Sequence, residues 1–305
     1  MKELVVKDNR LIQASYTLGL VEQRLILLAI VGARGLSEPI TADSLLTVHA
    51  DDYAQHFKVE RHTAYSVLAA AVETLFNRRA TVEVYDARRD TMRPMVVRWV
   101  TAMQYEEQLG CITLRFGAEV IPLITRLEQQ FTSYELQQVA GLKSAYAIRL
   151  YELLMQWKAV GKTPWFELAL FRRQLGLVDG EYKLMHQFKQ RVLDVALTQI
   201  NTQTDIVVSY TQHKNGRVIT GFSFSFFNKQ NFKKPEPKET PKPSSRLSNT
   251  TPAWDRLHDL ELHSCQQTQP HLTRADVEAY ATLMQISALR VMQQIKMGLI
   301  FDNNV

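Results

Sequence analysis

Between Trp165 and Phe227 the spacing of apolar residues changes from a helical to a strand pattern. A short amphipathic run, 165–180, precedes a longer one, from Tyr182 to Asn201, in which apolar residues recur every three or four positions. Two β-branched and aromatic runs, DIVVSY and RVITGFSFSF, follow and are joined by residues 213–217, which include Asn-Gly. Asn-Gly indicates a hairpin, because a type I′ turn needs positive φ at both central residues. The order helix, turn, helix, hairpin predicts a winged helix.

The second helix of this unit has two chemically different faces. We expect the apolar face to hold Leu184, Phe188, Val192, Val195 and Ala196. The apolar positions of the shorter run are Phe166, Leu168, Leu170, Phe171 and Leu175. The opposite face of the second helix carries Lys183, Gln187, Gln190, Arg191, Asp194 and Thr198. Long hydrogen-bond donors on a helix, with cations at a hairpin tip, suit reading of base edges and holding of phosphates. The alternative is a winged helix that binds only proteins and whose polar face is merely solvated.

The first half of the chain repeats this order. A leading arm at 5–15 is followed by expected helices at 16–34, 50–59 and 60–78, a short strand at 46–48, and the strand runs TVEVY, MVVRWVTAMQY and CITLRF. The third of these helices is expected to turn Ala64, Leu68, Ala71, Val72, Leu75 and Phe76 inward. The helix Leu142 to Trp157 connects the two halves.

Apolar positions match between the halves at two constant offsets. Tyr53, Phe57 and Val59 lie 118 residues before Phe171, Leu175 and Leu177. Leu68, Val72, Phe76, Val82 and Val84 lie 124 residues before Val192, Ala196, Ile200, Ile206 and Val208. A six-residue insertion between the two helices of the second half reconciles the offsets. The sequence therefore predicts an α+β fold of two tandem winged helices arranged as a pseudo-dimer.

Composition changes after Phe227. Half of the ten prolines fall between Pro235 and Pro252 among Lys, Ser, Thr and Asn, which indicates a linker that cannot bury enough apolar area to fold. Helical character returns from Trp254 onward. We therefore expect four parts: a first winged helix at 1–126, a second with its connecting helix at 127–228, a flexible linker at 229–252, and a small helical module at 253–305.

Charge and cysteine content narrow the class of protein. The chain has 305 residues, a net charge of +5 and only two cysteines, with no basic-then-apolar leader. Its longest apolar run, Leu25 to Val31, is far shorter than the roughly 20 residues that span a bilayer. These features favour a cytoplasmic protein with no membrane partner and are compatible with a polyanionic one.

Motifs for catalysis are missing. Gly161-Lys162-Thr163 resembles the end of a phosphate-binding loop, but Gln156 stands where that loop needs glycine. No His-x-His pair is present to hold the metal of a nickase, and no glycine-rich dinucleotide loop occurs. The spacing of His258, His263, Cys265 and His271 matches no common zinc site. We therefore expect no metal, no cofactor and no enzymatic activity.

Several short strings, in order, resemble one family. Tyr16-Thr17-Leu18, Gln23-Arg24-Leu25, Phe131-Thr132 and the distinctive YAIRLYE at 146–152 are similar to the iteron-binding plasmid replication initiators of the RepE, RepA and π type. The similarity extends from about residue 10 to residue 228. Within YAIRLYE we interpret Arg149 and Glu152 as a structural ion pair, because they stand one helical turn apart.

The resemblance implies a function and partners. It implies binding to double-stranded DNA at origin iterons, opening of the origin, recruitment of the host DnaA and DnaB helicase, and a monomer–homodimer equilibrium in which the dimer represses its own gene at an operator inverted repeat. It also implies that the second winged helix reads bases through Lys189, Gln190 and Arg191, although Gln190 stands where an arginine is expected. The first winged helix is expected to supply backbone contacts and dimerisation.

The DNA-binding candidates come from both halves. They are Lys183, Gln187, Lys189, Gln190, Arg191, Lys214 and Arg217 in the second half, and Arg61, His62, Arg78, Arg79 and Arg88 in the first. Two alternatives differ in class: a winged-helix transcriptional repressor without an initiation role, and a nicking or helicase enzyme, which the missing motifs argue against.

Overall fold

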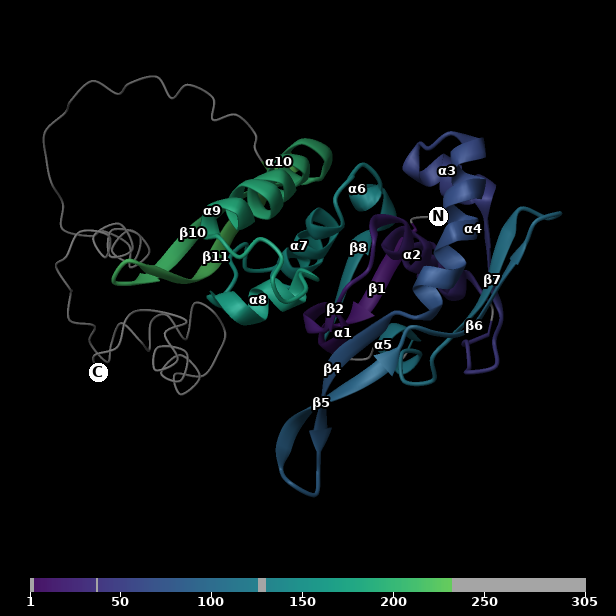
Figure 1. The fold of residues 1–305 in the computed structure, drawn as a ribbon, viewed down its shortest axis with the longest axis horizontal. Helices are drawn as coiled ribbons and strands as arrows, with labels where there is room; N and C mark the ends of the chain where they lie inside the picture. The colour runs from purple at the N-terminus through teal and green to yellow at the C-terminus, as the bar shows by residue number, and fades with distance from the viewer. Residues whose placement is uncertain (1–2, 37, 126–129, 232–305) are drawn as a thin grey trace, which may run out of the picture. The chain divides into compact units, whose positions relative to one another are not determined.

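A computed structural model describes residues 3–36, 38–125 and 130–231 of the chain. The expected C-terminal module lies outside these ranges, as does the expected linker except for the short 3-10 turn η2 (Lys229–Asn231). The described residues form two successive groups of helices and small antiparallel sheets (Figure 1). Within these ranges, no helix is long and apolar enough to cross a bilayer.

The first half is a winged helix with an additional hairpin. Helix α2 lies on the core side of the helix-turn-helix α3–α4, and the hairpins β4–β5 and β6–β7 follow. The strands form two sheets, ordered β2-β4-β5 and β3-β7-β6, in which β2 is the short strand Ser15–Tyr16. The elements are α2 (Leu20–Gly35), β3 (Leu46–His49), α3 (Ala50–Phe57), α4 (Arg61–Phe76), β4 (Arg79–Asp86), β5 (Thr91–Arg98), β6 (Val100–Glu106), β7 (Cys111–Phe116) and α5 (Pro122–Thr125).

The second half follows the same plan with one hairpin. The connecting helix α7 precedes the helix-turn-helix, whose second helix is divided into three segments, and the sheet is ordered β10-β11-β9. Its elements are α7 (Ala145–Met155), β9 (Phe166–Glu167), α8 (Leu168–Gln174), α9 (Met185–Phe188), the π-helical segment η1 (Lys189–Leu193), α10 (Asp194–Gln203), β10 (Ile206–Asn215) and β11 (Val218–Asn228). The two winged helices expected from the sequence are thus confirmed.

Several expected boundaries are wrong. The leading arm is structured: it forms β1 (Leu4–Asp8), which pairs with β8 (Phe131–Glu135), and α1 (Asn9–Gln13). The helix expected from Tyr16 begins only at Leu20, because Ser15 and Tyr16 form strand β2, which pairs with β4. The connecting helix spans Ala145–Met155 rather than 142–157, and a short helix α6 (Leu136–Ala140) precedes it.

Most of the matched apolar positions are buried in both halves. Tyr53 and Phe171 are buried at the first offset, and Leu68 and Val192 at the second. Val59, Val72 and Val84 are partly buried, and Phe76 is exposed: its exposed fraction is 39%, while its counterpart Ile200 is fully buried. Phe76 ends α4, and the Arg98 guanidinium lies 5.5 Å from its ring centroid, so the ring is covered by a cation rather than by the core.

A buried ionic cluster joins the N-terminal elements to α7. The Glu152 carboxylate accepts from Lys7 Nζ at 2.6 Å, Arg149 Nη1 at 2.7 Å and Tyr134 Oη at 2.6 Å, and Lys7, Arg149 and Glu152 are all at most 3% exposed. Burial alone would raise the Glu152 pKa, but the charges of Lys7 and Arg149 lower it to about 2. Burial lowers the pKa of Lys7, against the opposing effect of Glu152. The ion pair expected between Arg149 and Glu152 is confirmed.

Arg149 also connects the two halves. Its guanidinium donates to the carbonyls of Ile12 and Ala14, at 2.8 and 3.0 Å, and to the carbonyl of Gln174 in α8, at 3.0 Å. Nearby, the Thr17 hydroxyl donates to the Gly176 carbonyl at 3.2 Å. The segment between α1 and α2 therefore contacts the helix-turn-helix of the second half directly.

Candidate nucleic-acid interface

The second helix of the second winged helix, which we call the recognition helix (residues 185–203), presents a polar face to solvent. Gln187, Gln190 and Arg191 are exposed on it, and Lys183 is exposed in the turn before it. Phe188, Val192, Ala196 and Ile200 are buried on the opposite face. The polar face expected from the sequence is confirmed, and it carries long side chains that donate hydrogen bonds.

The apolar face differs from the expected one at three positions. Leu184 is 56% exposed and Val195 is 37% exposed, whereas Leu193 is fully buried. Leu184 lies in the turn rather than in the helix, which begins at Met185. The π-helical segment has wider turns than an α-helix, so it shifts the register and lets the adjacent residues Val192 and Leu193 both face the core. Leu170, an apolar residue of α8, is 41% exposed.

Lys189 points away from the exposed face of the recognition helix. It is half-buried, its Nζ donates to Gln212 Oε1 at 2.6 Å, and it lies 5.9 Å from the ring centroid of Tyr210. Burial and the charge of Asp194 raise the pKa of Tyr210 above its ordinary value. Lys189 therefore ties the recognition helix to strand β10.

The hairpin tip bears two exposed cations, Lys214 at the end of β10 and Arg217 in the turn. Asn215 pairs with Val218, so the two turn residues are Gly216 and Arg217, and the expected type I′ turn over Asn-Gly is wrong. Only Gly216, at φ +59°, has a positive φ in this turn, and glycine at the first central position is typical of type II′. A bulge between His213 and Lys214 shifts the register just before the tip.

The first-half candidates lie in three separate places. Arg61 and His62 begin α4, where Arg61 Nη2 is 2.5 Å from Asp51 Oδ2 of α3. Arg79 lies at the start of β4, and Arg88 in the β4–β5 turn; both are exposed. Figure 1 shows this hairpin extending beyond its neighbouring strands. The first winged helix thus carries its exposed cations mainly on a hairpin.

Arg78 is held in an internal ion pair. Its Nε lies 2.9 Å from Glu22 Oε1, and Glu22 is buried at the start of α2, where its carboxylate also accepts the backbone N–H of Gly19. Arg78 therefore joins the N-terminus of α2 to the start of β4, and the sequence pattern alone did not reveal this contact.

Two residues of the interface were not anticipated. Gln212 and Tyr210 hold Lys189, and their alternation along β10 already places them on one face of the strand, which is the signal that could have identified them. Among residues 3–36, 38–125 and 130–231, no group of three His, Cys, Asp or Glu side chains could hold a metal ion. The histidines and cysteine considered for zinc at 258–271 lie outside those ranges.

Known proteins resemble the chain over both halves. An uncharacterised 27.6 kDa protein of Escherichia coli is 28% identical over 239 residues, covering 75% of this chain and 97% of that protein. A replication initiation protein of Escherichia coli is 28% identical over 217 residues, covering 68% of this chain and 65% of that protein.

Among solved structures, that of the Pi initiator protein in complex with iteron DNA has the same fold. It superposes with a TM-score of 0.60 at 22% identity, covering 74% of this chain and 97% of that one. Residues 4–155 match the first winged helix (WH1) described for initiator replication proteins, and residues 167–226 match their second (WH2). The chain therefore belongs to the family of plasmid-type initiator replication proteins, with two winged-helix domains.

Proposed function

We propose that this chain initiates plasmid replication by binding directly repeated sites, iterons, at an origin. The observation that carries the proposal is the exposed face of the recognition helix, on which Gln187, Gln190 and Arg191 lie. The exposed cations Lys183, in the turn before this helix, and Lys214 and Arg217, at the hairpin tip, add to it. The fold shared with an initiator that was solved with iteron DNA supports this assignment.

The two groups of side chains have different tasks in this proposal. Gln187, Gln190 and Arg191 lie on a helix that fits the major groove, where glutamine pairs with adenine and arginine with guanine. Lys214 and Arg217 at the hairpin tip hold phosphates, which fixes the helix in register without reading sequence. Lys189 couples the two groups through Gln212 rather than contacting bases.

The first winged helix is proposed to bind DNA backbone and a second copy of the chain. Tyr85, Met92 and Val96, on the outward face of the β4–β5 hairpin, are 57, 50 and 61% exposed. Tyr85 pairs directly with Met92, so these side chains form one apolar surface, and β5 is an edge strand. Such a surface suits a self-complementary contact in a twofold dimer.

The dimer is proposed to repress the protein's own gene at an inverted repeat, since a twofold protein binds a twofold site. Recruitment of the host DnaA and DnaB helicase is proposed on the family membership alone. Cytoplasmic action without catalysis follows from the same proposal.

A replicon test distinguishes this function from its main alternative. Deleting the gene from its replicon should abolish plasmid maintenance, and supplying the protein in trans should restore it. Purified protein should shift a duplex carrying one direct repeat from the DNA beside the gene. A winged-helix repressor without an initiation role would instead give normal maintenance and only raised transcription of its target.

A further inference from the structure

The turn between the two helices of the helix-turn-helix is much longer in the second half than in the first. In the first half three residues, 58–60, separate α3 from α4, with Lys58 in a left-handed conformation. In the second half ten residues, 175–184, separate α8 from α9. The longer turn includes Gly176, Gly180 and Tyr182 at positive φ. Tyr182 is the least usual of these, because side chains other than glycine rarely adopt that region.

The side chain of Arg172 in α8 forms hydrogen bonds with the backbone of this long turn. Its guanidinium donates to the backbone carbonyls of Glu181 and Tyr182, the latter at 3.3 Å. The same guanidinium lies 4.8 Å from the ring centroid of Phe188, the first buried residue of the recognition helix. One side chain of α8 therefore fixes both the end of the turn and the start of the recognition helix.

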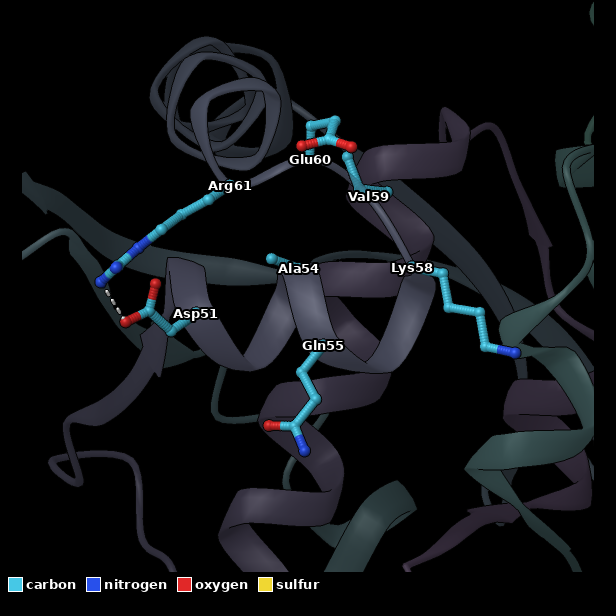
Figure 2. A pocket seen from close by; sticks show the side chains of 7 residues that line it. All are labelled: Asp51, Ala54, Gln55, Lys58, Val59, Glu60 and Arg61. Atoms are coloured by element: carbon cyan, nitrogen blue, oxygen red, sulfur yellow. Dashed lines mark hydrogen bonds and ion pairs between the residues drawn. The ribbon is translucent and has the colours of Figure 1, made fainter.

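In the first half, the position equivalent to Arg172 is occupied by an alanine. Ala54 stands 118 residues before Arg172, at the equivalent place on α3. There the space between the helices is an open hollow of about 400 Å³, whereas the corresponding hollow of the second half is about 130 Å³. Figure 2 shows Ala54 facing the hollow with only a methyl group, beside the Arg61–Asp51 ion pair. The two hollows correspond, because Asp51, Ala54 and Gln55 line the first and Ala169, Arg172 and Arg173, each 118 residues later, line the second.

We propose that Arg172 is a positioning residue for sequence-specific DNA binding: it fixes the turn that presents Lys183 and the N-terminal end of the recognition helix. This inference rests on the proposed function. Arg172 acts through the turn and is not required to contact DNA. Its guanidinium is occupied by two carbonyls and an aromatic face, which is the bonding that a planar fork of donors provides and an ammonium does not.

Removing Arg172 should weaken binding to cognate DNA more than binding to random DNA. Without Arg172 the turn has more conformations to lose when the helix enters the groove, so cognate binding weakens. Non-specific binding needs phosphate contacts only, and Lys214 and Arg217 still supply them. We expect Arg172→Ala in the full-length chain to weaken binding to one direct repeat by roughly 10–100-fold, equivalent to one or two charge-assisted hydrogen bonds. Arg172→Lys is expected to recover only part of this loss.

The experiment compares cognate and random duplexes over a salt series for wild type, Arg172→Ala, Arg172→Lys and the control Arg173→Ala. Arg173 is exposed on the same helix, so the control removes an equal charge and leaves the two hydrogen bonds from Arg172 to the turn in place. The expected result for Arg172→Ala is a lower ratio of cognate to random affinity at an unchanged salt slope. A slope reduced by about one, with equal losses on both duplexes, would mean that Arg172 contacts a phosphate and would overturn the proposal. An unchanged ratio would overturn it too.

Amide hydrogen exchange of the free protein provides a readout that needs no DNA. Arg172→Ala should speed exchange at Phe188, whose N–H donates to the Leu184 carbonyl at 3.0 Å, and leave the β10–β11 amides protected. Unchanged exchange at Phe188, or loss of protection throughout the hairpin, would contradict a local positioning role. If wild type fails to prefer direct repeats, the proposed function fails, whereas the exchange result still tests whether Arg172 holds the turn.

Discussion

Replacing Arg149 with methionine should destabilise the protein severely. The Arg149 guanidinium is fully buried and donates to Tyr16 Oη, to Glu152, and to the carbonyls of Ile12, Ala14 and Gln174. Methionine fills most of the volume but donates nothing, so three buried carbonyls lose a donor and Glu152 loses one of its two cationic partners.

The magnitude follows from these contacts. Each buried acceptor left unpaired costs about 1–3 kcal/mol, and breaking a buried ion pair costs about 3–5 kcal/mol. These penalties overlap, because Lys7 and Tyr134 still hold Glu152. We therefore expect the free energy of unfolding to fall by about 3–5 kcal/mol, a large part of the roughly 5–15 kcal/mol that a typical domain possesses.

Urea denaturation followed by far-UV circular dichroism measures this loss. The control is Arg173→Met, an exposed arginine whose replacement should change the free energy of unfolding by at most about 0.5 kcal/mol. If Arg149→Met is too unstable to purify, Arg149→Lys keeps the charge but not the fork and should show an intermediate loss. A decrease in the free energy of unfolding below about 1 kcal/mol for Arg149→Met would refute the reasoning, because five buried acceptors would then have lost their donor at almost no cost in stability.

Three further predictions concern acid, salt and the hairpin. Because Lys7 and Arg149 lower the Glu152 pKa from 4.5 to about 2, the contribution of Glu152 to stability should be complete above pH 4.5 and lost as the pH falls toward 2. Urea titrations at several pH values should show that Glu152→Gln removes this part of the acid dependence. An unaltered pH profile for Glu152→Gln would contradict the assignment. DNA affinity should fall about 10³–10⁵-fold between 50 and 200 mM salt if about 6–10 phosphates are contacted. If the affinity measured by fluorescence anisotropy hardly changes with salt, the basic surface does not contact the phosphates. Lys214→Ala and Arg217→Ala should weaken binding to cognate and random DNA about equally. Arg191→Ala should cost about 1–3 kcal/mol of binding free energy, mainly on the cognate site, and equal losses on both duplexes would make Arg191 a backbone contact.

The outline of the fold could be predicted from apolar spacing, because each winged helix buries the same faces. Phe188, Val192 and Ala196 recur at helical intervals and are buried as expected. Leu184 and Val195 were misplaced because a periodicity assumes one uniform helix, whereas a ten-residue turn and a π-helical segment change the register locally. Such local changes depend on packing against distant residues, which no short window contains.

Roles that depend on long-range partners were the hardest to predict. Arg78 and Lys189 are cations in suitable stretches of sequence, yet the structure pairs one with Glu22 and the other with Gln212. Lys214 and Arg217 lie at a hairpin tip, where a local turn signal is enough to place them in solvent. The sequence thus located exposed candidates in turns better than it distinguished internal contacts from external ones.

Footprinting a monomeric variant on a single direct repeat tests the central claim most directly. A charged substitution at Val96, on the outward face of β5, should give the monomer by interrupting the proposed dimer surface, which sedimentation can verify. If both winged helices of one chain contact successive turns of DNA, protection should cover roughly 20 bp of an asymmetric site, since grooves on one face lie about 10–10.5 bp apart. Protection of only about 10 bp, or a requirement for a palindrome, would contradict the account.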